Sequence, residues 1–257
     1  AGFGQRFEIQ ASMTQPFWLV GQAGAETTRP ADWQSWSGSV QARFPLVDVQ
    51  RLRQHVRLPV EVSAGRGALA ARLDLQRGRV RKLGLQADVQ DLNLRLAPDV
   101  QPLAFRRLKG ELSASNDEAT AELGYKQLAF TLTDGLQWPA SSGSLSWRHA
   151  PWPQGWPVSG WGDNLGGELR ADRLDLALLD SLADRLPLSP QHRSRLAEMS
   201  PRGVIEGLSW SWEGPANSPQ RYRLAGRVKG LALAESPELG RPGLAGANVV
   251  VQADEGG

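Results

Sequence analysis

The sequence predicts a mainly β protein: a long, twisted antiparallel sheet that curls into a trough, or half-pipe. Apolar and polar residues alternate along most of the 257 residues, which gives a sheet one dry face and one wet face. Turn residues interrupt the alternation about every ten residues, the spacing of antiparallel meanders. Helical periodicity is confined to a few short segments, which is too little helix to cover the dry face. The sheet must therefore curl over itself, or its dry face must meet something apolar.

The predicted strands carry apolar side chains at every second position, with mostly Arg, Asp, Glu, Gln and Ser between them. They cover residues 7–13, 40–44, 69–75, 83–89, 92–96, 108–114, 119–123, 128–132, 145–147, 208–212, 224–228 and 249–251. A further strand is expected around 165–172, just before the longest helical segment.

A first short helix is predicted near residues 48–57. Its apolar residues Val49, Leu52 and Val56 are spaced at i, i+3 and i+7. Pro45 precedes the segment and Pro59 ends it.

A helical hairpin is predicted near residues 175–199. Asp175 can cap the first turn of its first helix, and Pro187 ends that helix. Ser189 and Pro190 then pair an N-cap residue with the residue favoured at the first helical position. Leucines at 176, 179, 182 and 186 lie along one stripe, so the hairpin is expected to lie on the sheet.

The whole of residues 1–257 is predicted to form one β-rich segment. Hydrophobic residues make up 40% and charged residues 22%, as in an ordered globular protein. The Pro-, Gly- and Trp-rich stretch 147–164 is the most plausible internal seam. The chain begins without methionine and stops within an alternating pattern, which suggests a piece of a longer protein whose anchor or export signal lies elsewhere. No apolar run approaches the roughly 18 residues of a membrane span.

The formal net charge is only +2, although the sequence pI is about 9.3. The densest basic cluster is 77–82 (RGRVRK), beside a turn glycine. A solvated strand end explains this cluster, and a phosphate-rich surface is the alternative. No basic stripe is interleaved with aromatic residues, so a nucleic-acid partner is not expected.

The sequence shows no pattern typical of an enzyme, a cofactor site or a metal site. It contains no cysteine, and its histidines, His55, His149 and His192, lie far apart without a second ligand at metal-binding spacing. No G-x-S-x-G elbow precedes a helix, and the G-x-G phrases lack the third glycine of a dinucleotide site. We therefore expect no enzymatic activity, no cofactor and no metal.

The ten tryptophans leave three interpretations open. Trp147, Trp152, Trp156 and Trp161 crowd the 147–164 stretch. They suit packing in a core or seam, the rim of an apolar cleft, or a sugar-stacking platform.

The segment from Leu174 to Gly214 (LDLALLDSLADRLPLSPQHRSRLAEMSPRGVIEGLSWSWEG) resembles the central region of the YhdP family of AsmA-like proteins. In that family a strand runs into a leucine-rich segment ending in LP, then a short helix, a glycine and a new strand. The phrases at 166–172 and 108–112 look similar. The resemblance is best over roughly the last hundred residues.

The resemblance implies a bridge-like lipid transfer protein of the Gram-negative envelope, anchored in the inner membrane and otherwise periplasmic. It implies no catalytic residues. The first hypothesis is therefore a segment that conducts phospholipids between the inner and outer membranes, with acyl chains on the apolar floor and head groups in water at the rim. Its partners would be phospholipid acyl chains, the inner membrane and neighbouring segments of the same chain. The expected groove residues are Leu83, Leu85, Leu92, Leu94, Leu128, Phe130 and Leu132.

Two other classes stay open. A closed β domain would serve as a structural or assembly module of an envelope protein, without a lipid site of its own. A sugar-binding module would use Trp152, Trp156 and Trp161.

Overall fold

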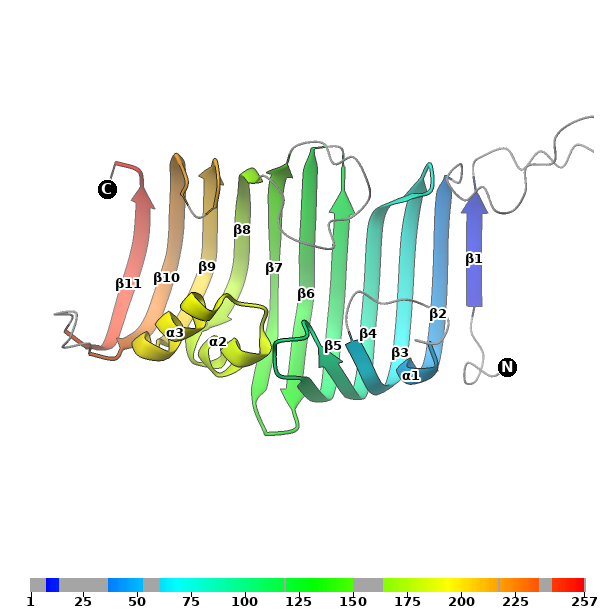
Figure 1. Cartoon of the computed structure of the whole chain (residues 1–257), viewed down its shortest axis with the longest axis horizontal. Coiled ribbons are helices and arrows are strands. Elements are labelled where there is room, and N and C mark those ends of the chain that lie inside the picture. The colour runs from blue at the N-terminus through cyan, green and yellow to red at the C-terminus, as the bar shows by residue number, and fades with distance from the viewer. Residues whose placement is uncertain are drawn as a thin grey trace, which may run out of the picture.

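The protein forms one eleven-stranded sheet in which the strands follow chain order, β1 to β11 (Figure 1). The computed structural model describes residues 8–13, 37–52, 61–117, 119–149, 164–216, 218–235 and 242–256. Every neighbouring pair is antiparallel, so the sheet is an open meander with β1 and β11 at its two ends. The strands are β1 (Glu8–Met13), β2 (Gly38–Asp48), β3 (Glu61–Gln76), β4 (Arg79–Arg95), β5 (Leu103–Asn116), β6 (Thr120–Leu132), β7 (Gln137–His149), β8 (Asn164–Asp175), β9 (Arg202–Glu213), β10 (Arg221–Leu233) and β11 (Leu244–Asp254).

The helices of the described chain all lie at one edge of the sheet, which we call the helix edge (Figure 1). They are α1 (Val49–Leu52), α2 (Leu176–Leu182), continued by the 3₁₀ turn η2 (Ala183–Arg185), and α3 (Pro190–Met199). The opposite edge carries the β3–β4 and β5–β6 turns, and we call it the turn edge.

The predicted caps of the hairpin are confirmed. The Asp175 carboxylate accepts hydrogen bonds from the backbone N–H groups of Ala177 and Leu178, at 3.1 and 3.2 Å. Ser189 accepts from the backbone of His192, and Pro190 occupies the first turn of α3. The structure shows α1 only as a short turn, and residues 53–60 of the predicted first helix lie outside the described residues.

Two packed clusters lie near the helix edge. The larger contains Leu103, Phe105, Leu132, Trp138 and Leu182, with the leucines of α2 packed against them. The smaller contains Val47, Val49 and Val62. The larger cluster holds the leucines of α2 against the apolar face of the sheet, and the smaller one packs Val49 of α1 against β2 and β3.

The alternation of side chains is interrupted by bulges. Asp91 and Gln127 have φ values of 53° and 49°, beside breaks in the strand register. Gly207 and Gly230 have φ values of 61° and 63° beside similar breaks. A bulge inserts one residue into a strand, which bends the strand and increases its twist. These insertions add local bending to the twist that every β-sheet has.

The predicted fold class is therefore confirmed: a mainly β, curled antiparallel sheet that is not closed into a barrel, with short helices on one face. Residues 150–163 of the proposed seam lie outside the described residues, and the seam and the single-domain organisation stay predictions. The strands that flank this stretch, β7 and β8, pair directly from Gly143 to His149.

Candidate functional site

A row of apolar residues crosses the whole sheet, one residue from each strand. Each is the cross-strand partner of the next, and all lie on the face that carries the helices. We call this set the apolar row. It consists of Ala11, Val40, Leu73, Leu83, Ala114, Leu123, Leu145, Leu169, Trp210, Leu224 and Ala253.

A second row of the same face lies two residues nearer the helix edge and is apolar or small except at Tyr125. It runs through Ile9, Ala42, Ala71, Leu85, Leu112, Tyr125, Gly143, Ala171 and Leu208. A third row runs between these two rows and lies on the opposite face of the sheet. Its residues are polar or small throughout. It runs through Gln10, Gln41, Arg72, Gly84, Ser113, Gly124, Ser144, Arg170, Ser209, Ala225 and Gln252.

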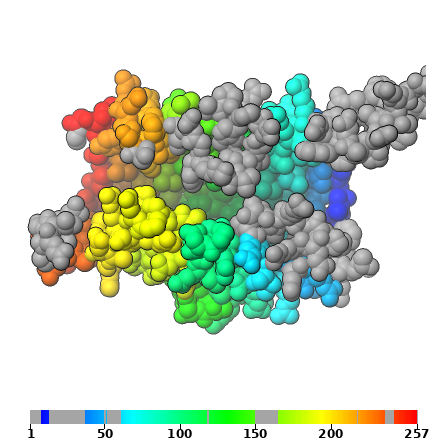
Figure 2. Space-filling model, in the orientation of Figure 1, coloured from blue at the N-terminus to red at the C-terminus, as the bar shows by residue number. Residues whose placement is uncertain are grey.

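Large apolar side chains of these rows remain accessible. Leu83 is 37% exposed, Leu112 42% and Leu123 39%. These leucines come from the adjacent strands β4, β5 and β6, and Leu83 and Leu123 both pair with Ala114. Figure 2 shows the middle strands of the sheet receding behind the helices on this face. A contiguous exposed apolar surface of this kind marks a binding site or an interface.

The apolar row is long compared with a single acyl chain. Ten steps between strands at about 4.8 Å each give roughly 50 Å. A bilayer's hydrocarbon core of about 30 Å holds two acyl layers, so one chain spans about 15 Å. The row is therefore about three acyl chains long.

The structure divides the seven expected groove residues into two groups. Leu83 and Leu85 lie in the open rows, whereas Leu92, Leu94, Phe130 and Leu132 belong to the packed clusters at the helix edge. Leu132 is only 1% exposed. Leu128 lies between the groups, where it packs closely against Gly110. Contact of these seven residues with lipid stays a prediction.

Several residues of the open rows were not among those expected to line the groove: Leu73, Leu112, Leu123, Leu145, Leu169, Trp210 and Leu224. Each belongs to a predicted strand or to the expected strand before α2. The missing information was the register between strands, which places these residues side by side.

A small polar cluster interrupts the apolar face on β6 and β7. The Trp138 Nε1–H donates to Ser141 Oγ at 2.9 Å, and Ser141 is buried. The Tyr125 side chain also hydrogen-bonds to Ser141 and lies against Gly143. Burial raises the pKa of Tyr125, with a smaller contribution in the same direction from the Asp172 carboxylate, while the bond to Ser141 acts in the opposite direction. Tyr125 is therefore a neutral phenol at physiological pH.

Tryptophans gather on the same face toward the turn edge. Trp147 and Trp212 are both buried and flank Gly167 across three strands. The Trp212 ring lies so close to Gly167 that a Cβ there would meet it. Trp210 and Trp212 stack with ring centroids 4.4 Å apart. For these three tryptophans, packing is the interpretation that the structure favours. Trp152, Trp156 and Trp161 lie outside the described residues.

Other candidate sites are not assembled in the described part of the chain. No three His, Asp or Glu side chains there come together in a way that could hold a metal ion. His149 is buried at the end of β7, and His192 is exposed on α3. None of the described helices combines the length and apolar character that crossing a bilayer requires.

Comparison with protein families decides the class of this sheet. The sequence matches the model of the YhdP protein family over residues 3–257. The chain belongs to the YhdP family. The match extends far beyond the last hundred residues in which the resemblance was best, so the N-terminal strands belong to the family pattern as well. No curated protein and no solved structure matches the chain. Membership supports the general class expected from the sequence, a bridge-like lipid transfer protein of the cell envelope.

Proposed function

We propose that this chain is a segment of a periplasmic lipid bridge that conducts phospholipids between the inner and outer membranes. The observation that carries the proposal is the apolar row, which crosses all eleven strands without a polar residue. Acyl chains would lie on this row and on the second row beside it. Head groups would stay in water at the turn edge, because the helices and packed clusters occupy the helix edge.

The driving force is partition. Covering an exposed Leu side chain with hydrocarbon is worth on the order of 1.5–3 kcal/mol when burial is complete. Adjacent sites on the row are chemically alike, so a lipid gains and loses similar contacts as it moves from strand to strand. A continuous surface of nearly equal sites permits movement without a catalytic residue or a cofactor. Tyr125, within the second row, and Ser141 next to it place polar groups on this path.

A closed assembly module is the competing function, and exposure argues against it. A packed domain would bury Leu83, Leu112 and Leu123, yet each is more than one-third exposed. The packed clusters near the helix edge show that this chain can bury leucine where it has covering material.

The direct test is lipid carried by the purified chain. We expect native mass spectrometry to find bound phospholipid on the wild-type protein. Leu112→Glu and Leu123→Glu would each remove most of it, because a carboxylate on the floor would lose its hydration beside an acyl chain.

Ser113→Glu is the matched control. Ser113 follows Leu112 in the sequence, is exposed and lies on the opposite face of the sheet. A glutamate at this position therefore adds the same charge without contacting the apolar rows. The proposal is supported if Ser113→Glu keeps the bound lipid and both leucine variants lose it. A wild-type protein without lipid, which also fails to bind a dye specific for exposed apolar surface, would favour the closed module instead.

A further inference from the structure

The two apolar rows contain a single hydroxyl group, that of Tyr125. Tyr125 lies in the second row, where Leu112 of β5 and Gly143 of β7 are its cross-strand partners. Leu112 is 42% exposed, and Leu123, two residues before Tyr125 on β6, is 39% exposed. The hydroxyl therefore belongs to a residue among the most exposed leucines of this face. Partition of acyl chains does not by itself explain a polar group there.

The ring of Tyr125 is seated on the neighbouring strand. A Cβ at Gly143 would come within 2.7 Å of the Tyr125 hydroxyl oxygen and 2.8 Å of its ring carbon Cε1. The glycine therefore leaves the space that the ring occupies against the β7 backbone. In this position the hydroxyl forms a hydrogen bond with Ser141, two residues before Gly143.

Ser141 is itself held in place from the packed side. It is 1% exposed, and its Oγ accepts a hydrogen bond from the Trp138 Nε1–H at 2.9 Å. Trp138 is buried and stacks on Phe130, with ring centroids 5.7 Å apart. The bond between Ser141 and Tyr125 acts to lower the pKa of Tyr125, which is the effect of a donor on a phenol oxygen. Ser141 therefore accepts from Trp138 and donates to Tyr125.

This chain of hydrogen bonds leaves one donor over. Trp138, Ser141 and Tyr125 supply one N–H and two O–H groups, and two bonds join them. With Ser141 donating to Tyr125, the remaining proton is that of the Tyr125 hydroxyl. Ser141 is the one hydrogen-bond partner of this hydroxyl among the described residues. Tyr125 is only half-buried, so its proton is available to a ligand that lies on the rows.

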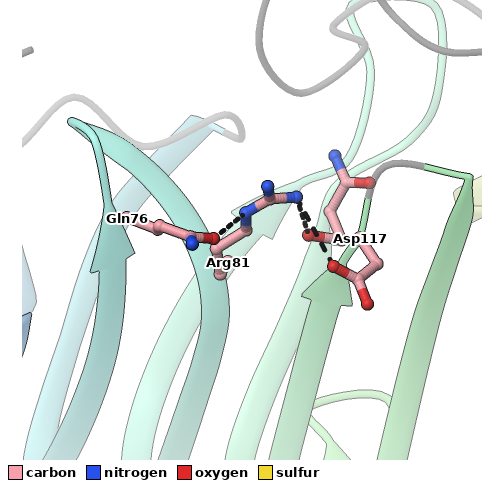
Figure 3. Close-up of polar contacts among 4 residues, drawn as sticks. Gln76, Arg81 and Asp117 are labelled. Atoms are coloured by element: carbon pink, nitrogen blue, oxygen red, sulfur yellow. Dashed lines mark hydrogen bonds and ion pairs between the residues drawn. The ribbon is translucent and has the colours of Figure 1, made fainter. Parts of the chain in front are cut away.

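A polar side chain at the turn edge shows the contrasting case, in which the protein supplies the acceptors (Figure 3). The Arg81 Nε donates to the Gln76 side-chain oxygen at 3.0 Å, and its Nη1 donates to the Asn116 carbonyl at 3.3 Å. The same guanidinium contacts the Asp117 carboxylate at 3.6 Å. Tyr125 has no such acceptor within the described chain, and it lies where hydrocarbon would cover it.

The spare proton sets a condition on what can cover Tyr125. Water can accept it while the surface is open. Hydrocarbon that displaced this water would leave the hydroxyl without a partner, which is unfavourable. A charged phosphate would accept the proton but would lose its own hydration on an apolar surface. An ester carbonyl lies directly at the head of each acyl chain, is neutral, and accepts a hydrogen bond without donating one.

We propose that the Tyr125 hydroxyl binds the ester carbonyl of a lipid whose acyl chains lie on the neighbouring leucines. This assignment rests on the proposed function and adds the chemical group that the path recognises, the ester of an acyl lipid. Tyr125, positioned by Ser141 and Gly143, is then a specificity residue within a surface that otherwise selects only for hydrocarbon.

The test compares the diester and diether forms of phosphatidylethanolamine with the same chain length, which differ only in the two carbonyl groups. An equimolar mixture is offered in the same vesicles to the full 257-residue chain. The two lipids differ in mass, so native mass spectrometry counts both on the protein at once. We expect the wild-type protein to prefer the diester lipid by about three- to tenfold, the usual contribution of one neutral hydrogen bond.

Tyr125→Phe should abolish this preference by weakening diester binding, while diether binding stays as in the wild type. Phenylalanine keeps the ring against Gly143 and removes only the hydroxyl, so folding should not depend on the change. The matched control is Tyr222→Phe on β10, which removes the other tyrosine hydroxyl outside the two rows and should leave the preference intact.

Infrared spectroscopy of the bound diester lipid provides a readout that loss of packing would not reproduce. A hydrogen bond weakens the ester C=O bond, and the ester band lies apart from the amide bands of the protein. We expect this band at a lower frequency on the wild-type protein and on Tyr222→Phe than on Tyr125→Phe. The same frequency on all three proteins would overturn the assignment.

The outcomes separate this site from the proposed function. If neither lipid binds the wild-type protein, lipid conduction fails and the ester site fails with it. If the wild-type protein binds both lipids equally, or Tyr125→Phe weakens both to the same extent, conduction stands and the ester site is wrong. Equal weakening would mean that the hydroxyl contacts the head group, which the two lipids share.

Discussion

At the scale of single residues, exposure separates two kinds of leucine that look alike in the sequence. Leu132 is 1% exposed within the larger cluster, whereas Leu123 lies on the same strand and face and is 39% exposed. Both occur at alternating positions of β6, so periodicity assigns them the same role. The structure buries Leu132 in the core and leaves Leu123 accessible on the surface of the same face.

This difference predicts that the same substitution, Leu to Ala, lowers stability at one position and lipid binding at the other. Leu132→Ala should lower the free energy of unfolding by about 2–5 kcal/mol, the usual cost of a cavity in a packed core. Leu123→Ala should cost about 1 kcal/mol or less, yet it should be the variant that reduces lipid binding. Urea denaturation measures the first effect and native mass spectrometry the second. Equal losses of stability would contradict the division of the face into core and floor.

Carboxylates on the wet face predict how stability depends on pH. A hydrogen bond from Arg107 lowers the pKa of Asp88 below its usual value, and a bond from Lys229 does the same for Glu206. The Asp88–Arg107 pair is bidentate, at 3.1 and 3.0 Å. A lowered pKa in the folded state means that the unfolded chain takes up protons first as the pH falls. The stabilisation is therefore complete above the usual carboxyl pKa and is lost as the pH falls below it.

Asp88→Asn should remove part of this dependence. We expect the variant to be less stable than wild type at pH 6, by at most about 1 kcal/mol for an exposed pair. The difference should shrink as the pH falls through the carboxyl range to about 3. Urea midpoints measured across this range provide the check, and a constant difference at every pH would refute the assignment.

At the scale of elements, the hairpin depends on its caps and on one ion pair to the sheet. Asp175 satisfies two backbone donors at the start of α2. The Arg185 guanidinium contacts Asp134 in the β6–β7 turn at 2.6 Å, which ties η2 to the sheet. The leucines of α2 then close the larger cluster.

Asp175→Ala should destabilise the protein by about 1 kcal/mol, the usual effect of losing an N-cap. Amide exchange should accelerate first in residues 176–185, because this helix loses its cap. Asp180→Ala removes the same charge within α2 without touching the cap and should have little effect. Similar exchange in both variants would show that the charge, and not the cap, is responsible.

The elements also show what the sequence could predict. The alternation of apolar and polar residues predicted the strands, because one face of the sheet is exposed to water. The capping residues Asp175 and Ser189, with Pro190, predicted the helical hairpin. In the sequence, a bulge shows only as a shift of the alternation by one residue. For example, apolar residues occupy odd-numbered positions up to Val89 and even-numbered positions from Leu92, and Asp91 between them has a positive φ. The apolar row was not predictable, because it depends on the register of ten strand pairs that no local pattern encodes. The burial of His149 likewise depends on neighbouring strands.

At the scale of the whole molecule, the sheet is open at both ends and covered along one edge. A roughly 50 Å apolar surface cannot be explained as the core of a closed domain while its central leucines stay exposed. The strand order leaves β1 and β11 as end strands, so the row reaches both ends of the described sheet.

The most direct test is photo-crosslinking along the apolar row. A photo-reactive amino acid placed singly at Val40, Leu83, Leu145 and Leu224 samples the row from β2 to β10. Ser144, beside Leu145 on the opposite face, is the control. We predict phospholipid adducts at all four positions of the row and none at Ser144. Adducts at one position only, or at none, would contradict a continuous lipid path across the sheet.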